Sequence, residues 1–157
     1  AVMQHTAGAD ICIAAAAVAY YRPARISGHK IKKSTASMSL ELERNPDIIA
    51  TVAALEDGPF TVGFAAETGS VESHARDKRR AKSLDMIAAN AVGPGLGFDT
   101  EDNELQVFWD GGTQRLPRAR KTLLARELVA LIAERYRVVN NSNKVIDLHA
   151  QDSAQGS

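Results

Sequence analysis

The chain has 157 residues, 45% of them hydrophobic and 24% charged, and its formal net charge is zero. This length can bury the core of one domain, and the balanced charge excludes a global field that would draw the protein to nucleic acid or to a membrane surface. The longest apolar run, residues 11–19, is too short to span a bilayer. The single cysteine, Cys12, cannot form an internal disulfide and is consistent with a cytoplasmic protein.

The first segments predict a helix end followed by strands. Residues 1–10 resemble the last turn of a helix with Gly8 as its C-cap, so we expect the sequence to begin part-way through a larger unit. The apolar run 11–19 predicts a buried strand, although its alanines leave a helix open. A basic loop is expected over 20–36, and the alternation in 37–43 predicts a half-exposed strand.

The middle of the chain alternates helix and strand signals. Asn45, Pro46 and Asp47 supply an N-cap, a proline at the first helical position and an acid in the first turn, which predicts a helix through Leu55. Two buried strands are then expected, over 60–66 and 85–92, with a charged helix over 71–84 between them. Strand–helix–strand units of these lengths pair in parallel through right-handed crossovers, so the fold class is α/β.

The pattern changes after residue 92. Two short strands, 104–109 and 113–116, flank Gly111–Gly112 and predict a β-hairpin. A long amphipathic helix is expected over 118–136. Its apolar face comprises Leu123, Leu124, Leu128, Leu131 and Ile132. We expect one folded domain over residues 1–137 and a polar, disordered tail over 138–157.

Three basic or capping features are candidates for binding an anion. Lys30 and Lys32 alternate with Ile31, so an extended loop would present both on one side, either to solvent or to a phosphate. Lys78 and Lys82 share one face of the charged helix, where like charges repel unless a bound polyphosphate removes the penalty. The helix start at Pro46–Asp47 offers free N–H groups, but Asp47 opposes an anion there, and a well-capped helix is the favoured interpretation.

Other classes of site find little support. A basic patch with few aromatic neighbours on a chain of zero net charge argues against nucleic acid, although the charged helix keeps that hypothesis open to a salt-dependence test. The four histidines never occur at metal-ligand spacing, so no metal site is assigned to the protein's own side chains.

Five blocks in order resemble the phosphopantothenoylcysteine synthetase (phosphopantothenate–cysteine ligase) family. They lie between residues 10 and 136 and read AAAAVA-x-YRPA, KIKK, NPDII, VGFAAET and KRRAKSLDMIAAN. In bacteria this family is usually the C-terminal half of a bifunctional coenzyme A biosynthesis flavoprotein. The resemblance implies a Rossmann-like three-layer parallel sheet, with the strand-rich segment GFDTEDNELQVFW associated with a homodimer interface.

The resemblance also implies the reaction and its partners. Such enzymes join 4′-phosphopantothenate to cysteine through an acyl-cytidylate made from CTP, with Mg²⁺ on the nucleotide. FMN is expected only if an upstream decarboxylase domain is present. A non-catalytic nucleotide-binding or oligomerisation module that keeps the fold is the alternative.

Site residues follow from the resemblance by motif. Lys30 matches the catalytic lysine of a flap. The expected nucleotide contacts are Ala14, Ala15, Ala16, Tyr20, Lys30, Pro46, Asp47, Ile48, Ile49, Phe64, Lys78 and Lys82.

Two features of the family pattern differ in this sequence. The family has an aspartate at the position of Tyr20, and a phenol cannot offer the two acceptor oxygens of a carboxylate. The family's upstream glycine- and serine-rich turn, with an asparagine that handles the acyl intermediate, does not occur in the sequence. We therefore expect an incomplete pocket and an exposed sheet edge.

Overall fold

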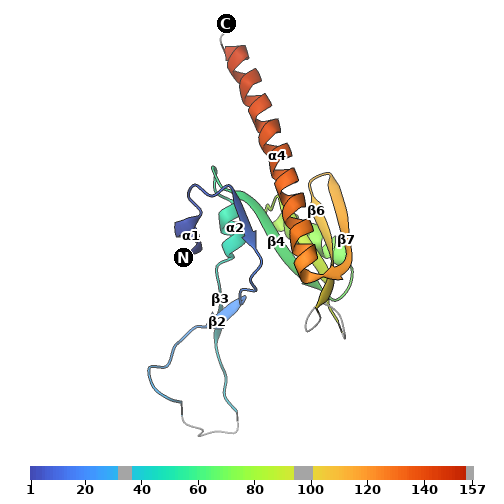
Figure 1. The fold of residues 1–157 in the computed structure, drawn as a ribbon. Helices are drawn as coiled ribbons and strands as arrows, with labels where there is room; N and C mark the ends of the chain where they lie inside the picture. Colours follow the sequence, from blue (N-terminus) through green and yellow to red (C-terminus); the bar gives the residue numbers. More distant parts are fainter. Residues whose placement is uncertain (32–36, 94–100, 155–157) are drawn as a thin grey trace.

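A computed structural model describes residues 1–31, 37–93 and 101–154 of the chain, and these form a sheet with helices on both faces (Figure 1). The elements are α1 (Val2–His5), β1 (Ile11–Ala14), β2 (Tyr21–Pro23), β3 (Leu42–Arg44), α2 (Ile48–Ala53), β4 (Phe60–Glu67), α3 (Val71–Ala81), β5 (Met86–Ala91), β6 (Asp102–Trp109), β7 (Gly112–Arg120) and α4 (Lys121–Ala154).

The main sheet has five strands in the order β1-β4-β5-β6-β7. The first three pair in parallel, as the alternation of helix and strand signals predicts. The predicted hairpin is confirmed as β6 and β7, which join the same sheet antiparallel. The sheet is therefore mixed, and the parallel part covers only its first half. Within the described residues β1 is an edge strand, in agreement with the expected exposed edge.

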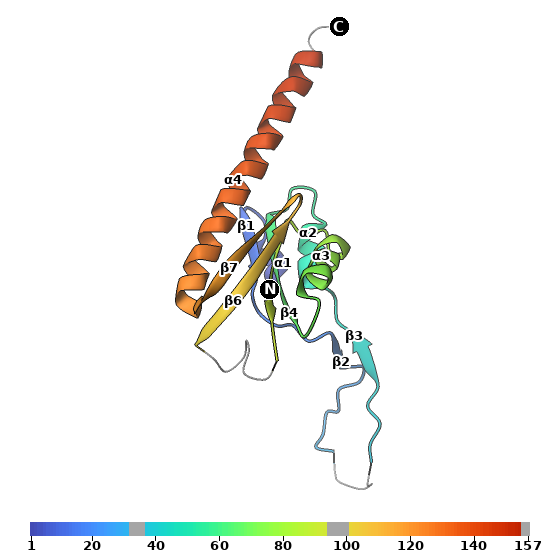
Figure 2. The ribbon, with the colours of Figure 1, turned by 90° about the vertical axis from the view of Figure 1, so that its right-hand side faces the viewer.

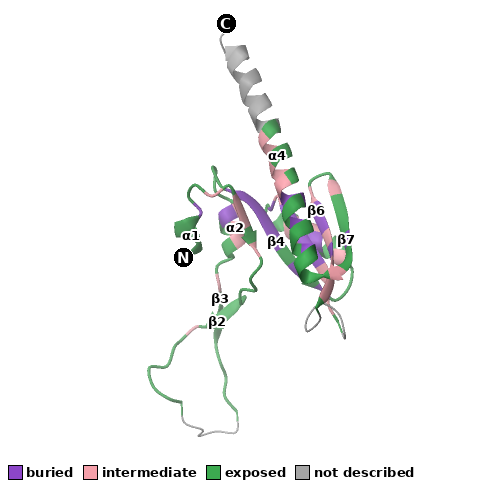
Figure 3. Cartoon of the chain, viewed as in Figure 1, coloured by how far each residue is buried: buried purple, intermediate pink, exposed green. Residues whose placement is uncertain are grey.

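The helices cover the two faces of the sheet in three layers. Figure 2 shows α2 and α3 on one face and α4 on the other. Alternate residues of β4 point to opposite faces, so Phe60 and Val62 pack under α4 while Ala65 packs with Ala75 of α3. Figure 3 shows buried residues in β4 and β6, and β5 adds four more to the same core, Met86, Ile87, Ala88 and Ala89. This core fixes the positions of the strand ends.

β1 and the following segment differ from the sequence prediction. A strand was expected over 11–19, but β1 ends at Ala14, whose register partner is Gly63. The chain then leaves the sheet and forms an arm, described over residues 20–31 and 37–45, with the short ribbon β2–β3 at its base (Figure 1). All six residues of β2 and β3 are exposed, and the predicted strand over 37–43 is confirmed only near its end.

α4 is longer than the predicted helix. It begins at Lys121, because Arg118–Arg120 still belong to β7, and it continues to Ala154. The disordered tail expected from residue 138 is thus helical in the structure as far as Ala154. No glycine or proline occurs between Arg118 and Gln155 to stop a helix. Among the described helices, none is both long and apolar enough to cross a membrane.

Candidate functional site

The candidate site lies at the carboxyl edge of the parallel strands. β1 ends at Ala14, β4 at Glu67 and β5 at Ala91, and these ends share one edge because the three strands run in the same direction. α2 and α3 flank this part of the sheet on one face (Figure 2). In open α/β sheets ligands bind outside the carboxyl ends of the strands, which directs attention to the charged groups found here.

Glu67 places a buried carboxylate at the end of β4. Only 8% of the residue is exposed, and it points to the α3 face of the sheet. Its Oε1 accepts a hydrogen bond from Lys78 Nζ at 2.6 Å, and its Oε2 lies 3.3 Å from His74 Nδ1. A buried carboxylate needs such partners, since an unpaired charge in the interior is costly. Glu67 therefore holds one lysine of α3 at the carboxyl edge.

Lys82 is held in a similar way by α2. Its Nζ lies 2.9 Å from Asp47 Oδ2, while Asp47 Oδ1 accepts from the backbone N–H of Ala50 at 3.2 Å. Burial alone would raise the pKa of Asp47. The hydrogen bonds from Lys82 and Ala50 and the charges of Lys82 and Arg44 outweigh burial and lower that pKa below its usual value. Asp47 is consequently a charged cap at neutral pH.

The identity of this cap corrects one prediction. Asp47, not Asn45, is the N-cap of α2, and the helix begins at Ile48. Asn45 instead closes the base of the arm: its backbone N–H donates to the carbonyl of Tyr20 at 2.8 Å, and its Nδ2 donates to the carbonyl of Ala19 at 2.7 Å. The interpretation of Pro46–Asp47 as a capped helix start, rather than an anion site, agrees with this geometry.

Lys78 and Lys82 thus form a pair of positioned cations on α3. They are one helical turn apart, and each meets a carboxylate from a different element, β4 or α2. These carboxylates relieve the like-charge repulsion that the sequence predicts between the two lysines. Lys78 is still 41% exposed, so an incoming phosphate can reach it without unfolding α3. Chemically, the arrangement suits an anion with several charged oxygens.

Some of the other residues expected to contact the nucleotide lie at this edge of the sheet, and others do not. Ala14 ends β1 and is half-buried, while Ala15 and Ala16 are exposed just beyond it. Pro46 and Ile48 are exposed beside Asp47, and Ile49 is half-buried. The residues around Asp47 are thus next to the partner of Lys82, while Ala14–Ala16 follow the end of β1 at the same edge of the sheet. Their nucleotide contacts stay predictions.

Phe64 and Tyr20 lie elsewhere. Strand alternation puts Phe64 on the same sheet face as Val62, under α4 rather than α3, and it is 39% exposed. Tyr20 is exposed at the base of the arm. The structure therefore does not bring either side chain against Lys78 or Lys82, and their contact with a nucleotide stays a prediction.

Lys30 lies on the arm and is exposed. The arm leads away from the sheet in both Figure 1 and Figure 2, so Lys30 is not gathered with the lysines of α3. Its neighbours Lys32 and Lys33 lie outside the described residues. The arm is tied at its base by Arg22 Nε, which donates to Glu43 Oε1 at 2.6 Å. The catalytic role of Lys30 stays a prediction.

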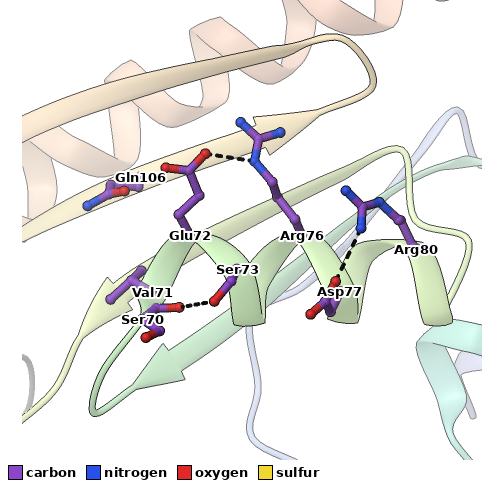
Figure 4. Close-up of a pocket in the computed structure, with 8 residues that line it drawn as sticks. All are labelled: Ser70, Val71, Glu72, Ser73, Arg76, Asp77, Arg80 and Gln106. Carbon is purple, nitrogen blue, oxygen red and sulfur yellow. Dashed lines mark hydrogen bonds and ion pairs between the residues drawn. The ribbon is translucent and has the colours of Figure 1, made fainter.

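A hollow of about 730 Å³ runs along the opposite side of α3, next to β6 (Figure 4). Its acids and bases are already matched within the helix: Arg76 pairs with Glu72 at 2.9 Å and Arg80 with Asp77 at 3.2 Å. The guanidinium of Arg76 also lies 4.8 Å from the centre of the Phe108 ring. None of the residues predicted from the sequence lines this hollow, and its balanced charge selects no ligand.

No group of three or more histidine, cysteine or acidic residues that could hold a metal occurs in the described parts of the chain. A Mg²⁺ ion that arrives with a nucleotide is bound mainly by phosphate oxygens and water, with one or two carboxylates from the protein. Asp47 and Glu67 are the acids nearest the lysine pair by their contacts, and both already pair with it.

Sequence reasoning missed Glu67 and His74. The predicted strand ended at Ala66, one residue before the carboxylate. An acid directly after a buried apolar strand is a signal for a group positioned at the carboxyl edge. The pairing of Asp47 with Lys82 carried no such signal, because it joins residues 35 positions apart on two helices.

Comparisons with known proteins show which family the chain resembles. The model of a family described as DNA/pantothenate metabolism flavoprotein C-terminal domain matches residues 1–136. The coenzyme A biosynthesis bifunctional protein CoaBC of Vibrio cholerae is 50% identical over 138 residues, 85% of this chain and 35% of that protein. The Escherichia coli protein of the same name is 47% identical over 132 residues, 81% of this chain and 32% of that protein. The chain spans about a third of the length of these relatives.

Solved structures show the same fold. The crystal structure of the C-terminal domain of CoaBC superposes with a TM-score of 0.67 at 34% identity, covering 89% of this chain and 60% of that one. The DNA/pantothenate metabolism flavoprotein from Streptococcus pneumoniae gives a TM-score of 0.62 at 18% identity, covering 85% and 64% of the two chains, and supports the fold alone.

Proposed function

Since the chain belongs to the family of DNA/pantothenate metabolism flavoprotein C-terminal domains, we propose that it carries the phosphopantothenate–cysteine ligase activity of coenzyme A biosynthesis. The substrates are 4′-phosphopantothenate, CTP and cysteine, and the enzyme acts in the cytoplasm as a homodimer. The relatives are named as bifunctional coenzyme A biosynthesis proteins, which supports the pathway.

The observation that carries this proposal is the pair of lysines on α3. Lys78 and Lys82 are anchored by Glu67 and Asp47 beside the carboxyl edge of a parallel sheet. A nucleoside triphosphate needs several cations at fixed positions, and a helix supplies them with little loss of side-chain freedom. Phosphate oxygens would share these lysines with the two carboxylates.

The chemistry takes two steps. A carboxylate oxygen of 4′-phosphopantothenate attacks the α-phosphorus of CTP, the bond to the β-phosphate oxygen breaks, and pyrophosphate leaves. The amine of cysteine then attacks the acyl carbon, the bond to the CMP oxygen breaks, and one proton is released. Charge builds on phosphate oxygens in the first step and on the acyl oxygen in the second. Positioned cations stabilise this charge more than they stabilise the substrates.

The lysines and the alanines among the expected site residues have separate parts in this proposal. Lys78 and Lys82 hold the phosphates, and Mg²⁺ bound with CTP neutralises further charge. Small side chains at Ala14–Ala16 let the backbone approach the nucleotide. Lys30 acts from the arm on the reacting phosphate. FMN is expected only if an upstream decarboxylase domain is present.

Pyrophosphate release tests the proposal. The purified chain is mixed with Mg²⁺, CTP and 4′-phosphopantothenate, first without cysteine and then with it. We expect pyrophosphate in both mixtures and continuous turnover only with cysteine. No pyrophosphate above a protein-free control would contradict the proposal.

A non-catalytic nucleotide-binding or oligomerisation module is the second candidate. Tyr20 in place of the family aspartate favours it, together with the separation of Lys30 from α3. Such a module would bind CTP without releasing pyrophosphate. Calorimetry with CTP, run beside the release assay, separates the two candidates.

A further inference from the structure

A second hollow of about 410 Å³ lies at the other end of the parallel strands. It is bounded by the first residue of β4 (Phe60), the end of α3 (Arg79), the end of β6 (Trp109) and a later turn of α4 (Arg135). The lysine pair is absent from its lining, and Glu67 at the carboxyl end of β4 is separated from Phe60 by the length of the strand. The hollow is therefore distinct from the candidate active site.

Arg135 brings an unneutralised charge to this hollow. Its guanidinium carbon lies 4.9 Å from the centre of the Trp109 ring, so a cation–π contact holds the group in place. Its Nε is shielded from solvent and has no hydrogen-bond acceptor. Arg135 also forms no ion pair with any acid in the described parts of the chain. A half-buried guanidinium that has no ion pair and an unbonded Nε within the described residues is a position at which an anion would be stabilised.

Trp109 gives Arg135 a rigid support. The indole lies directly against Gly112 across the turn of the β6–β7 hairpin, where an added Cβ would fall 2.3 Å from Trp109 Nε1. Only glycine leaves room for the ring at this point. The hairpin turn thus fixes the indole, and the indole fixes the guanidinium.

Arg79 supplies a second guanidinium. Its side chain is 16% exposed, and its Nη1 donates to the carbonyl of Leu84 at 3.0 Å, which orients the group at the end of α3. Its Nη2 donates to Asp110 Oδ1 at 3.2 Å, but the Asp110 side chain is 99% exposed. Such a solvent-exposed acid contributes little and is easily displaced.

The acids of the hollow leave a positive balance. Asp85 is occupied by β4, because its Oδ2 accepts from the Thr61 backbone N–H at 2.7 Å and from Thr61 Oγ1 at 2.9 Å. Asp110 is the other acid of the lining, so three arginines (79, 80 and 135) face two carboxylates, and Arg80 also pairs with Asp77 at 3.2 Å. Arginine is the side chain best suited to paired hydrogen bonds with a phosphate.

We propose that this hollow is a second anion site, which binds a phosphate group, free or esterified to a small molecule, between Arg135 and Arg79. The bound phosphate takes the place of Asp110 at Arg79 Nη2 and supplies the anion that Arg135 lacks. The site is independent of the ligase reaction, and its occupancy does not require the lysines of α3.

Trp109 offers a direct readout, since it is the only tryptophan of the chain. Its fluorescence is followed while inorganic phosphate or ribose 5-phosphate is added at constant ionic strength. We expect a saturable change with a midpoint in the millimolar range or below, near −4 kcal/mol at 1 mM. A tighter midpoint for ribose 5-phosphate identifies an esterified ligand, and equal midpoints identify phosphate alone; both support the site.

Matched variants test whether phosphate binds at Arg135. Arg135→Gln is expected to weaken binding by about tenfold or more, and Arg137→Gln, which removes the same charge from an exposed position of the same helix, is expected to leave it unchanged. Arg135→Lys keeps the charge but loses the planar guanidinium that can donate two hydrogen bonds to one phosphate, so it should show intermediate affinity. The Lys78→Ala/Lys82→Ala variant should retain the Trp109 response in full.

Three results would overturn the proposal. These are the absence of a saturable change in the unmodified chain, equal weakening in the Arg135→Gln and Arg137→Gln variants, and loss of the response in the double lysine variant. If Arg135→Gln does not fold, judged by circular dichroism, the comparison of Arg135→Lys with the unmodified chain decides the same question.

Discussion

The lysines of α3 and the lysine of the arm serve the same proposed reaction from two very different supports. Lys78 and Lys82 stand on a helix packed against the core, and buried or half-exposed carboxylates hold their side chains. Lys30 is on an arm whose ribbon consists of exposed residues in two three-residue strands. In the proposed function the lysines of α3 therefore bind the anion at fixed positions, and the arm contributes a cation whose removal should leave the core intact.

The largest effect is expected at Lys30. Lys30→Ala should lower the rate of pyrophosphate release by about 10²–10³-fold, as removal of one donor to a developing charge commonly does. The free energy of unfolding should change by less than about 0.5 kcal/mol, because the residue is exposed. Steady-state kinetics and urea unfolding measure the two quantities. Arg25→Ala, an exposed charge on the same arm, is the control, and an equal loss of rate there would contradict a specific role for Lys30.

Lys78, in contrast to Lys30, should have a clear effect on the stability of the fold. Lys78→Ala leaves the Glu67 carboxylate, which is 10% exposed, without its closest partner. We expect the free energy of unfolding to fall by about 1–3 kcal/mol. Arg80→Ala breaks an ion pair on the same helix in which both side chains are mostly exposed, and should cost less than about 1 kcal/mol. Urea unfolding that finds the two variants equally stable would show that the contact of Lys78 with Glu67 stabilises the fold no more than an exposed ion pair does.

Tyr20 tests the base of the arm. Tyr20→Asp restores the carboxylate of the family pattern, which offers two acceptor oxygens where the phenol offers one. We expect CTP affinity to rise by about tenfold, equivalent to about 1.4 kcal/mol. Tyr20→Phe, which removes only the hydroxyl, should bind CTP as the unmodified chain does. Equal affinity of the aspartate variant and the unmodified chain, measured by calorimetry, would count against this position as a nucleotide contact.

The smallest effect is expected at Asp47. Asp47→Ala removes both the cap of α2 and the partner of Lys82, and should cost about 1 kcal/mol. Asp47→Asn should cost less, because asparagine also caps a helix. The pKa of Asp47 is lower in the folded state than its usual value, so its contribution is present above the unfolded pKa, about 3.9, and is lost as pH falls through the folded pKa.

Urea unfolding at neutral and acid pH checks this sign. The difference in unfolding free energy between the unmodified chain and Asp47→Asn should shrink as the solution is acidified below about pH 4. A difference that grows on acidification would show that the charged form of Asp47 does not stabilise the fold.

Local patterns account for most of what the sequence predicted correctly. The buried strands β4 and β5 follow from apolar runs, and the β6–β7 hairpin from Gly111–Gly112, where Gly111 has a φ of +70°. The apolar face of α4 is confirmed at Leu124, Leu128, Leu131 and Ile132, which are buried, whereas Leu123 is 47% exposed. In each case the signal lies within a few neighbouring residues.

The errors concern contacts between distant residues. Asn45 and Asp47 both suit an N-cap, and the choice depends on Lys82 and on the carbonyls of Ala19 and Tyr20, which only the fold brings near. The end of β1 at Ala14 is likewise not encoded locally, because β4 continues to Glu67, beyond Gly63, the register partner of Ala14. The resemblance named Lys78 and Lys82 as site residues, but composition could not show that each is anchored by a carboxylate.

The most direct test of the account is the affinity of the lysine pair for Mg²⁺–CTP. Calorimetry should compare the unmodified chain with Lys78→Ala/Lys82→Ala and with Arg118→Ala/Arg137→Ala, which removes two exposed charges elsewhere. We predict that the lysine variant binds at least about tenfold more weakly, a loss of about 1.4 kcal/mol or more, while the arginine variant is unchanged. Equal affinity of all three proteins would contradict the assignment of α3 as the anion-binding element.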